Sequence, residues 1–69
     1  MRVNAGYTVT DTIHIGQVEF VLGEQANGKQ FATWECRDGD NYYWGHYFDS
    51  LAAAKRDLLI RAHEALGGK

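Results

Sequence analysis

Residues that could carry catalysis or hold a metal ion occur in this chain, but not in patterns that bring them together. The soft metal-ligand candidates are one cysteine and three histidines: Cys36, His14, His46 and His63. None of them has the C-x-x-C or H-x-x-x-H spacing that brings two ligands to one metal. Cys36 and His46 could meet across adjacent strands, but the sequence supplies no orienting group and no oxyanion site for such a pair. We therefore predict no metal site, no cofactor and no catalytic residue.

The segment from Arg37 to Asn41 begins like a calcium-binding loop, because Asp38 and Asp40 are spaced by one residue. A complete loop needs a third oxygen ligand and a glutamate at its twelfth position. Tyr42 stands at the third ligand position, and no glutamate stands at the twelfth. The segment therefore indicates a hairpin turn. A hydrolase or nuclease would have to depend on Asp38, Asp40 or His46, and we predict that the chain is not an enzyme.

Composition favours a small folded domain with an acidic surface. A chain of 69 residues forms one domain, 1–69, and buries only about 60% of the surface its unfolded form exposes. Residues 1–50 contain seven acidic and three basic side chains, and residues 51–69 contain two acidic and four basic ones. Nucleic-acid binders normally present a basic surface to phosphate, so the larger part of this chain has the opposite sign.

The sequence also bears on where the protein acts. Cys36 is the only cysteine, so no internal disulfide is possible. Residues 1–6 contain no apolar run typical of a signal peptide, and no stretch approaches the length that spans a membrane. We expect a cytoplasmic protein with no membrane contact.

Periodicity predicts the elements that must position any site. Apolar residues alternate with polar ones from Tyr7 to Ile15, and alternation resumes from Val18, after a Gly16-Gln17 turn suited to a type II′ hairpin. Turn residues separate two further strands, and from Leu51 apolar residues recur every three to four positions. The expected fold is α+β: a three- to four-stranded antiparallel meander packed against one C-terminal helix. The strands are expected at about 7–15, 18–23, 30–37 and 41–47, and the helix at about 50–66.

The aromatic residues of the last strand provide the main functional clue. Side chains of alternate residues point to opposite faces, so Tyr42, Trp44, His46 and Phe48 should share one face, and Tyr43, Gly45 and Tyr47 the other. A single helix covers only one face of a small sheet, and aromatic rings should therefore be exposed on the other. This face could thicken the core, support self-association, bind another protein, or stack on single-stranded bases.

Three resemblances add to this interpretation. From Phe31 onward, Trp44-Gly45, Phe48-Asp49-Ser50 and the helical spacing of Ala54, Leu58 and Ala62 resemble the ethylene-response and integrase-arm DNA-binding domains. That resemblance implies a three-stranded sheet packed on one helix. The order of four strands and a helix also resembles the bent-sheet, single-strand-binding coactivator domains, which dimerise. The segments 33–37 and 43–48 are similar to short uncharacterised proteins of clostridial phages and conjugative elements. Some proteins of that size and origin inhibit host-defence nucleases, so this resemblance implies a context and no functional residues.

Together these patterns predict a small non-enzymatic binding protein of a phage or mobile element, expected to form a homodimer. Its acidic, aromatic sheet face would dock on a protein partner, a candidate being a host-defence or nucleic-acid-processing enzyme. The expected partner-binding residues are Trp34, Tyr43, Trp44, Tyr47, Glu35, Asp38 and Asp40. The alternative is a DNA-binding protein that stacks the same aromatics on bases. Its expected phosphate contacts are Lys29, Arg37, Lys55, Arg56 and Arg61.

Overall fold

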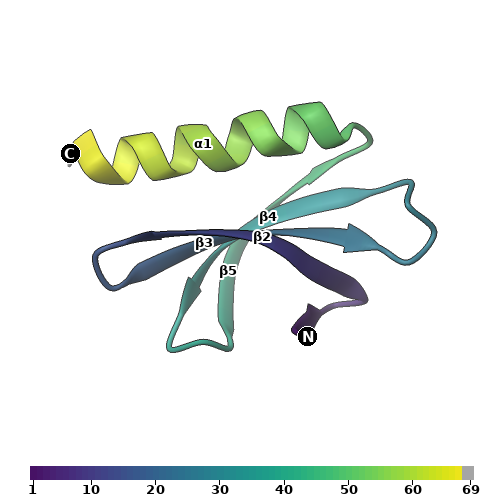
Figure 1. The fold of residues 1–69 in the computed structure, drawn as a ribbon, viewed down its shortest axis with the longest axis horizontal. Coiled ribbons are helices and arrows are strands. Elements are labelled where there is room, and N and C mark those ends of the chain that lie inside the picture. The colour runs from purple at the N-terminus through teal and green to yellow at the C-terminus, as the bar shows by residue number, and fades with distance from the viewer. Residues whose placement is uncertain (68–69) are drawn as a thin grey trace.

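The computed structural model describes residues 1–67, which form one curled antiparallel sheet and one helix (Figure 1). The strands follow one another in the sheet in chain order and are listed here with the helix: β1 (Val3–Asn4), β2 (Tyr7–Ile15), β3 (Val18–Gln25), β4 (Phe31–Arg37), β5 (Asn41–Phe48) and α1 (Leu51–Gly67). The expected α+β class and the antiparallel meander are confirmed. The expected strand number is corrected to five, because the two-residue β1 pairs with the start of β2.

Local chemistry explains where the elements turn and begin. Ile15 pairs with Val18, so Gly16 and Gln17 form a two-residue turn, and the φ of 62° at Gly16 suits its first central position. Ser50 caps the helix: its Oγ accepts a hydrogen bond from the Ala53 N–H at 3.2 Å.

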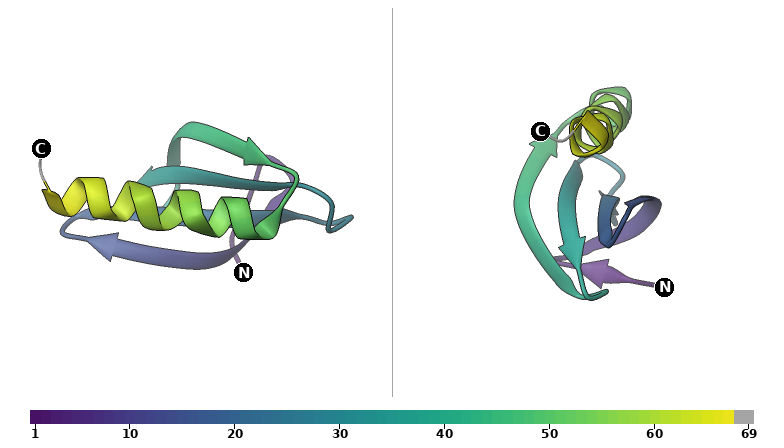
Figure 2. Two further views of the ribbon diagram at one scale, coloured as in Figure 1. Left: turned by 90° about the horizontal axis from the view of Figure 1, so that it is seen from above. Right: turned by 90° about the vertical axis from the view of Figure 1, so that its left-hand side faces the viewer.

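One face of the sheet is covered by the helix, which lies along it (Figure 2). The small residues Ala54 and Ala62 and the larger Leu58 face the sheet, where they pack with Phe20, Leu22 and Phe31. These helix residues recur at four-residue spacing, which places them in one stripe. The small side chains let the helix approach the sheet closely, and the larger ones fill the space between them.

The other face covers itself, because the sheet curls so that β2 and β5 approach one another across it (Figure 2). Trp34 lies at the centre of this curl and is only 3% exposed. The rings of Tyr7, Tyr42 and Tyr47 lie 5.5, 5.8 and 6.3 Å from it, each close to edge-to-face. Such edge-to-face contacts contribute stability beyond the area they bury. A second core therefore exists where no helix is present.

An ion pair closes one end of this second core. Glu19 is nearly buried on the same face as Cys36, and the guanidinium of Arg2 binds both of its carboxylate oxygens. Arg2 also donates to the Gly39 carbonyl at 3.2 Å. The hydrogen bonds from Arg2 hold the pKa of Glu19 below its ordinary value. The burial of the Glu19 carboxylate in a small core is thus compensated by Arg2, the residue just before β1.

Candidate functional site: the outer side of strand β5

A β-bulge in β5 changes the expected order of its side chains. Tyr43 pairs with Glu35 and His46 pairs with Thr33, so two residues of β5, Trp44 and Gly45, lie opposite Trp34 alone. The predicted alternation is therefore wrong beyond Tyr43. Trp44 has a φ of 54°, a left-handed conformation that is uncommon for a residue with a bulky side chain.

Gly45 makes this bulge compatible with the second core. A Cβ atom at position 45 would lie 2.7 Å from the Trp34 Nε1 and 2.7 Å from the Tyr47 hydroxyl. Only glycine leaves room for the Trp34 ring to lie directly against the strand. The lack of a side chain at Gly45 therefore accommodates the buried indole of Trp34, and the bulge turns the ring of Trp44 outward.

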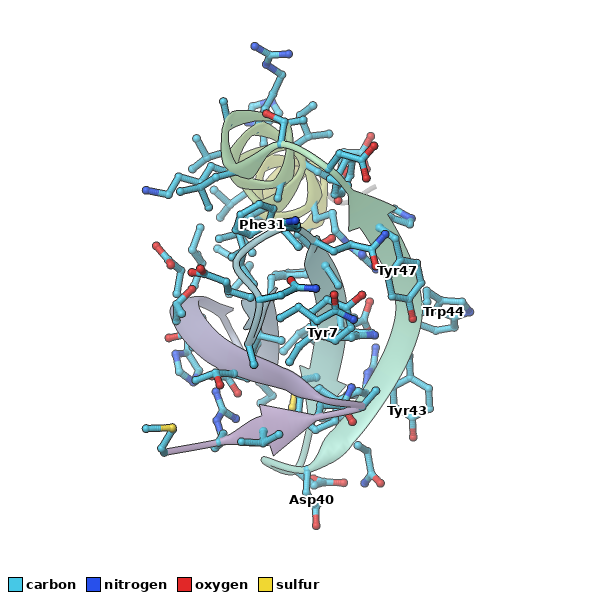
Figure 3. All side chains as sticks on the ribbon, turned by 90° about the vertical axis from the view of Figure 1, so that its right-hand side faces the viewer. Tyr7, Phe31, Asp40, Tyr43, Trp44 and Tyr47 are labelled. Carbon is cyan, nitrogen blue, oxygen red and sulfur yellow. The ribbon has the colours of Figure 1, made fainter. Side chains whose placement is uncertain are left out.

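The bulge exposes two adjacent rings on the outer side of β5. Tyr43 is 41% exposed and Trp44 is 66% exposed, and their ring centroids lie 5.4 Å apart. We call Tyr43 and Trp44 the aromatic pair. Figure 3 shows both side chains projecting away from the curl, whereas Tyr7 lies inside it. Tyr47 is also exposed, but its ring contacts Tyr7 and Trp34 on the inner side of β5.

The sequence predicted that exposed aromatics would lie on the face without the helix. That prediction is wrong for Trp34, which is buried by the curl, and for Tyr43, which shares the side of Glu35 and Thr33. The Trp34 ring packs against β5 at Gly45 on the inner face and does not reach the surface. Tyr47 is the exposed ring on the face without the helix. The aromatic pair instead flanks the helix, because β5 extends beyond the area that α1 covers (Figure 2).

A polar network joins the helix to the strand beneath the aromatic pair. Thr33, fully buried, donates its hydroxyl to Asp57 Oδ2 at 2.6 Å, and His46 Nδ1 lies 2.9 Å from the same oxygen. Arg61 donates to the hydroxyl and carbonyl oxygens of Thr33, and at 2.8 Å to the Trp44 carbonyl. The helix thereby holds the bulge in place from its own side. Asp57 and Arg61 are four residues apart on α1 and so lie on one flank.

Burial lowers the pKa of the Arg61 guanidinium, which nonetheless stays protonated at neutral pH. The buried charge is compensated by Asp57 and by three carbonyl or hydroxyl contacts. The sequence did not predict this network. Its only sequence signal was the four-residue spacing of Asp57 and Arg61, which is common on exposed helix surfaces as well.

A groove of about 390 Å³ lies between Trp44 and the helix side of this network. Its main lining residues come from four elements and are Phe20, Glu35, Trp44, His46, Arg61 and Glu64. One wall is thus an indole ring, and two others carry carboxylates. The Glu35 carboxylate is held by Arg37, with 2.7 Å between Oε2 and Nη2. Glu64 is an exposed residue on the polar flank of the helix.

The remaining predicted site residues lie around this surface. Asp38 and Asp40 are exposed in the turn between β4 and β5, and Figure 3 shows Asp40 at the tip of that hairpin. Asp38 has a φ of 58°, which suits a turn. The turn is therefore a hairpin, as the sequence indicated, and it places both carboxylates at the end of the strand that carries the aromatic pair.

The five basic residues of the DNA-binding alternative do not form one track. Lys29 lies in the turn before β4 and Arg37 at the end of β4, so the seven-residue strand separates them. Such a strand is about 23 Å long. Lys55 lines a groove beside β2, Arg56 is exposed on the helix, and Arg61 is committed to Thr33 and Trp44. These charges do not follow a single backbone path.

Two further sequence predictions concern chemistry. Cys36 and His46 lie on opposite faces of the sheet, since Cys36 belongs to the second core while His46 contacts Asp57 from the helix side. Burial raises the pKa of the Cys36 thiol, which makes it a weaker nucleophile at neutral pH. Within residues 1–67, no group of three or more potential metal-ligating side chains comes together.

Comparison with known proteins adds no relative. No family model, no curated protein and no solved structure gives a significant match to this chain. Within the part of the chain that the structure describes, no helix has both the length and the apolar character needed to cross a membrane.

Proposed function

We propose that this protein is a non-enzymatic binding protein that docks the outer side of β5 on a basic surface of a protein partner. The observation that carries the proposal is the aromatic pair, and in particular the conformation of Trp44. A left-handed backbone costs an L-residue about 1–2 kcal/mol, and glycine or asparagine would avoid much of that cost. A large indole held there and left 66% exposed is therefore a poor choice for stability alone. Strain of this kind is typical of functional positions.

Charge argues for a basic partner. Between Arg37 and Lys55 the chain contains no lysine or arginine, and it contains Asp38, Asp40 and Asp49, all exposed. These residues surround the strand that carries the aromatic pair. Complementary charge steers association and suppresses wrong partners. Tyrosine and tryptophan are enriched among the residues that dominate interface energetics.

The groove beside Trp44 suggests how one contact would form. A lysine or arginine side chain of the partner would lie between the Trp44 ring and the carboxylates of Glu35 and Glu64, which line the groove together with Arg61 and His46. An indole face attracts a cation by about 0.5–2 kcal/mol, depending on how far the cation is desolvated. Because Arg61 holds the bulge in position before binding, little ordering of the strand remains to be done at that step.

The wider context of the proposal comes from the resemblances. We infer that the protein belongs to a phage or mobile element, acts in the cytoplasm, and occludes the basic substrate-binding surface of a host-defence or nucleic-acid-processing enzyme. A single cysteine, buried in the second core, is compatible with a reducing compartment. Occlusion needs only a tight fit at a surface that otherwise binds phosphate, and it requires no chemistry from this chain.

The test is quantitative capture from a bacterial extract with Trp44→Asn as the variant and Ile60→Gln as the matched control. Asparagine tolerates the left-handed backbone, and Ile60 is an exposed hydrophobe of the helix, 47% exposed, outside the groove. We expect wild type and Ile60→Gln to retain the same proteins with basic surfaces, and Trp44→Asn to lose them at least tenfold. Equal capture by Trp44→Asn, or no specific capture by wild type, contradicts the proposal.

The DNA-binding alternative has its own measurement. Fluorescence anisotropy with a labelled single-stranded oligonucleotide should show no binding at physiological salt. Binding that weakens steeply as salt is added would instead indicate phosphate contacts, and would favour the nucleic-acid function over the protein partner.

A further inference from the structure

We propose that a second copy of this chain docks along the outer edge of β2 and the helix flank beside it. The sequence predicted a homodimer and offered self-association as one use of the aromatic face, but the geometry points to the opposite edge of the sheet. β1 pairs with β2 only at Tyr7 and Thr8. In the described residues, the stretch from Asp11 to Ile15 pairs with β3 on one side and with no strand on the other. An open strand edge presents unpaired N–H and C=O groups that readily pair with another chain.

The helix flank above this edge presents two exposed leucines, with Lys55 beside them. Leu59 is 62% exposed and Leu66 is 70% exposed. By helical spacing, both lie on the flank opposite to the one that carries Asp57, Arg61 and Glu64. A groove of about 380 Å³ follows the same flank and is lined by Asp11, Thr12, Ile13, Lys55, Leu58 and Leu59. The two flanks of the helix thus differ. Asp57 and Arg61 on one flank hydrogen-bond to the sheet, whereas Leu59 and Leu66 on the other are exposed to solvent.

The occupant of this groove must satisfy two requirements at once. It must place a strand about 4.8 Å from β2, the spacing of paired strands. It must also place an apolar element, such as a helix, with its axis about 8–10 Å from that of α1. A foreign strand would meet the first requirement and leave Leu59 and Leu66 in water. A second copy meets both, because its own β2 edge and α1 flank have the same spacing.

Two-fold symmetry would give this interface an apolar centre and a polar rim. β2 would pair antiparallel with its copy, and the two sheets would become one ten-stranded sheet, twice the five strands of one chain. Ile13 and Leu59 would then lie near the axis. The charged residues of the groove, Asp11 and Lys55, would lie toward both ends. An apolar centre with a polar rim is the arrangement typical of protein interfaces.

This dimer is independent of the proposed partner-binding surface. β2 and β5 lie toward opposite edges of the sheet, so self-association leaves the aromatic pair free. Substitutions at one edge should not affect the other, which makes the two proposals separable by experiment.

The test is solution mass by sedimentation equilibrium, from low to high micromolar concentration, with two matched helix variants. Leu59→Glu places a charge on the proposed interface, whereas Ile60→Glu changes an equally apolar, exposed neighbour that faces elsewhere. We expect wild type and Ile60→Glu to have the mass of two chains at high concentration, and Leu59→Glu to have the mass of one. Circular dichroism should show equal helix content in all three.

A cross-link provides a second measurement. Because Leu59 would lie near the two-fold axis, oxidised Leu59→Cys should form an intermolecular disulfide in high yield, and Ile60→Cys should not. A wild-type monomer at every concentration overturns the proposal. So does a dimer that Leu59→Glu leaves intact, or one that Trp44→Asn dissociates, because the latter would place the interface on β5.

Discussion

The two faces of the sheet are buried in different ways. The helix-covered face is filled by aliphatic and small residues from two elements, so each side chain packs against a second layer. The other face has no second layer, and the sheet curls over its own aromatic side chains, with Trp34 at the centre. The comparison shows that a small sheet with a single helix can bury both of its faces. The face without the helix must then carry rings large enough to meet across the curl.

The two faces also depend on different local features. The first needs only the apolar stripe of α1 and the sheet residues beneath it. The second depends on the glycine at position 45, on the bulge that follows from it, and on the counter-ion that Arg2 supplies to Glu19. It should therefore be the face more sensitive to small changes of shape and charge.

The largest expected effect comes from removing the central side chain of each face. Trp34→Ala should lower the free energy of unfolding by about 3–5 kcal/mol, and Leu58→Ala by about 2–5 kcal/mol, since both leave cavities in a core. Urea denaturation followed by circular dichroism measures both. If Trp34→Ala costs less than about 1 kcal/mol, the aromatic face is only a loose cover and the comparison fails.

Gly45→Ala should lower the free energy of unfolding by about 1–3 kcal/mol, because the new methyl group would meet the Trp34 ring. Gly67→Ala is the matched control, since a Cβ there meets nothing within 4 Å. The control should be neutral or stabilise the helix by up to about 1 kcal/mol. Equal effects at the two positions would mean that the curl can open to accept a side chain at no cost.

The ion pair of the aromatic face predicts a pH dependence. Because the pKa of Glu19 is lower in the folded protein than its ordinary value of 4.5, its stabilising contribution is present above that value. It is lost as the pH falls through the lower, folded-state pKa. We expect about 1 kcal/mol, near the low end for a charged pair because Arg2 is partly exposed.

Glu19→Gln should therefore lose less stability than wild type between about pH 5 and pH 3, the range in which carboxyl groups ordinarily titrate. Urea denaturation at each pH measures the difference. Arg2→Gln should behave in the same way, and the double variant should show coupling between the two positions. An unchanged pH profile in both single variants would show that Glu19 needs no counter-ion.

The smallest effect is expected outside both faces. Trp44→Asn should change the free energy of unfolding by less than about 1 kcal/mol, since the indole is mostly exposed and asparagine accepts the left-handed backbone. Thermal unfolding measures this difference. A loss as large as that of Gly45→Ala would assign the indole to the fold and weaken its role as a binding residue.

The sequence predicted the long elements because their periodicity is strong. Alternation identified β2 and β3, turn residues separated β4 and β5, and the stripe of Ala54, Leu58 and Ala62 identified the helix face that is buried. The short β1 has too few residues to produce any period. Ser50 was recognisable as a cap because its side chain acts within one helical turn.

The site was harder to predict, because it depends on one irregular residue. A strand period of two assumes that no residue is inserted, so the left-handed Trp44 reversed the assignment of every later side chain in β5. The curl that buries Trp34 depends on contacts between β2 and β5, which are distant in the chain. Of the predicted partner-binding aromatics, Tyr43, Trp44 and Tyr47 are exposed, and the burial of Trp34 could not be inferred from alternation alone.

The meander order has a consequence for how the chain folds. Each long strand pairs with the next one along the chain, so the sheet can form hairpin by hairpin through contacts that are local in the sequence. The side chains of Phe20, Leu22 and Phe31 are covered by α1, so any state in which the helix is undocked exposes an apolar sheet face. Exposed apolar surface of this kind favours aggregation, and docking of the helix is therefore the step that protects the sheet.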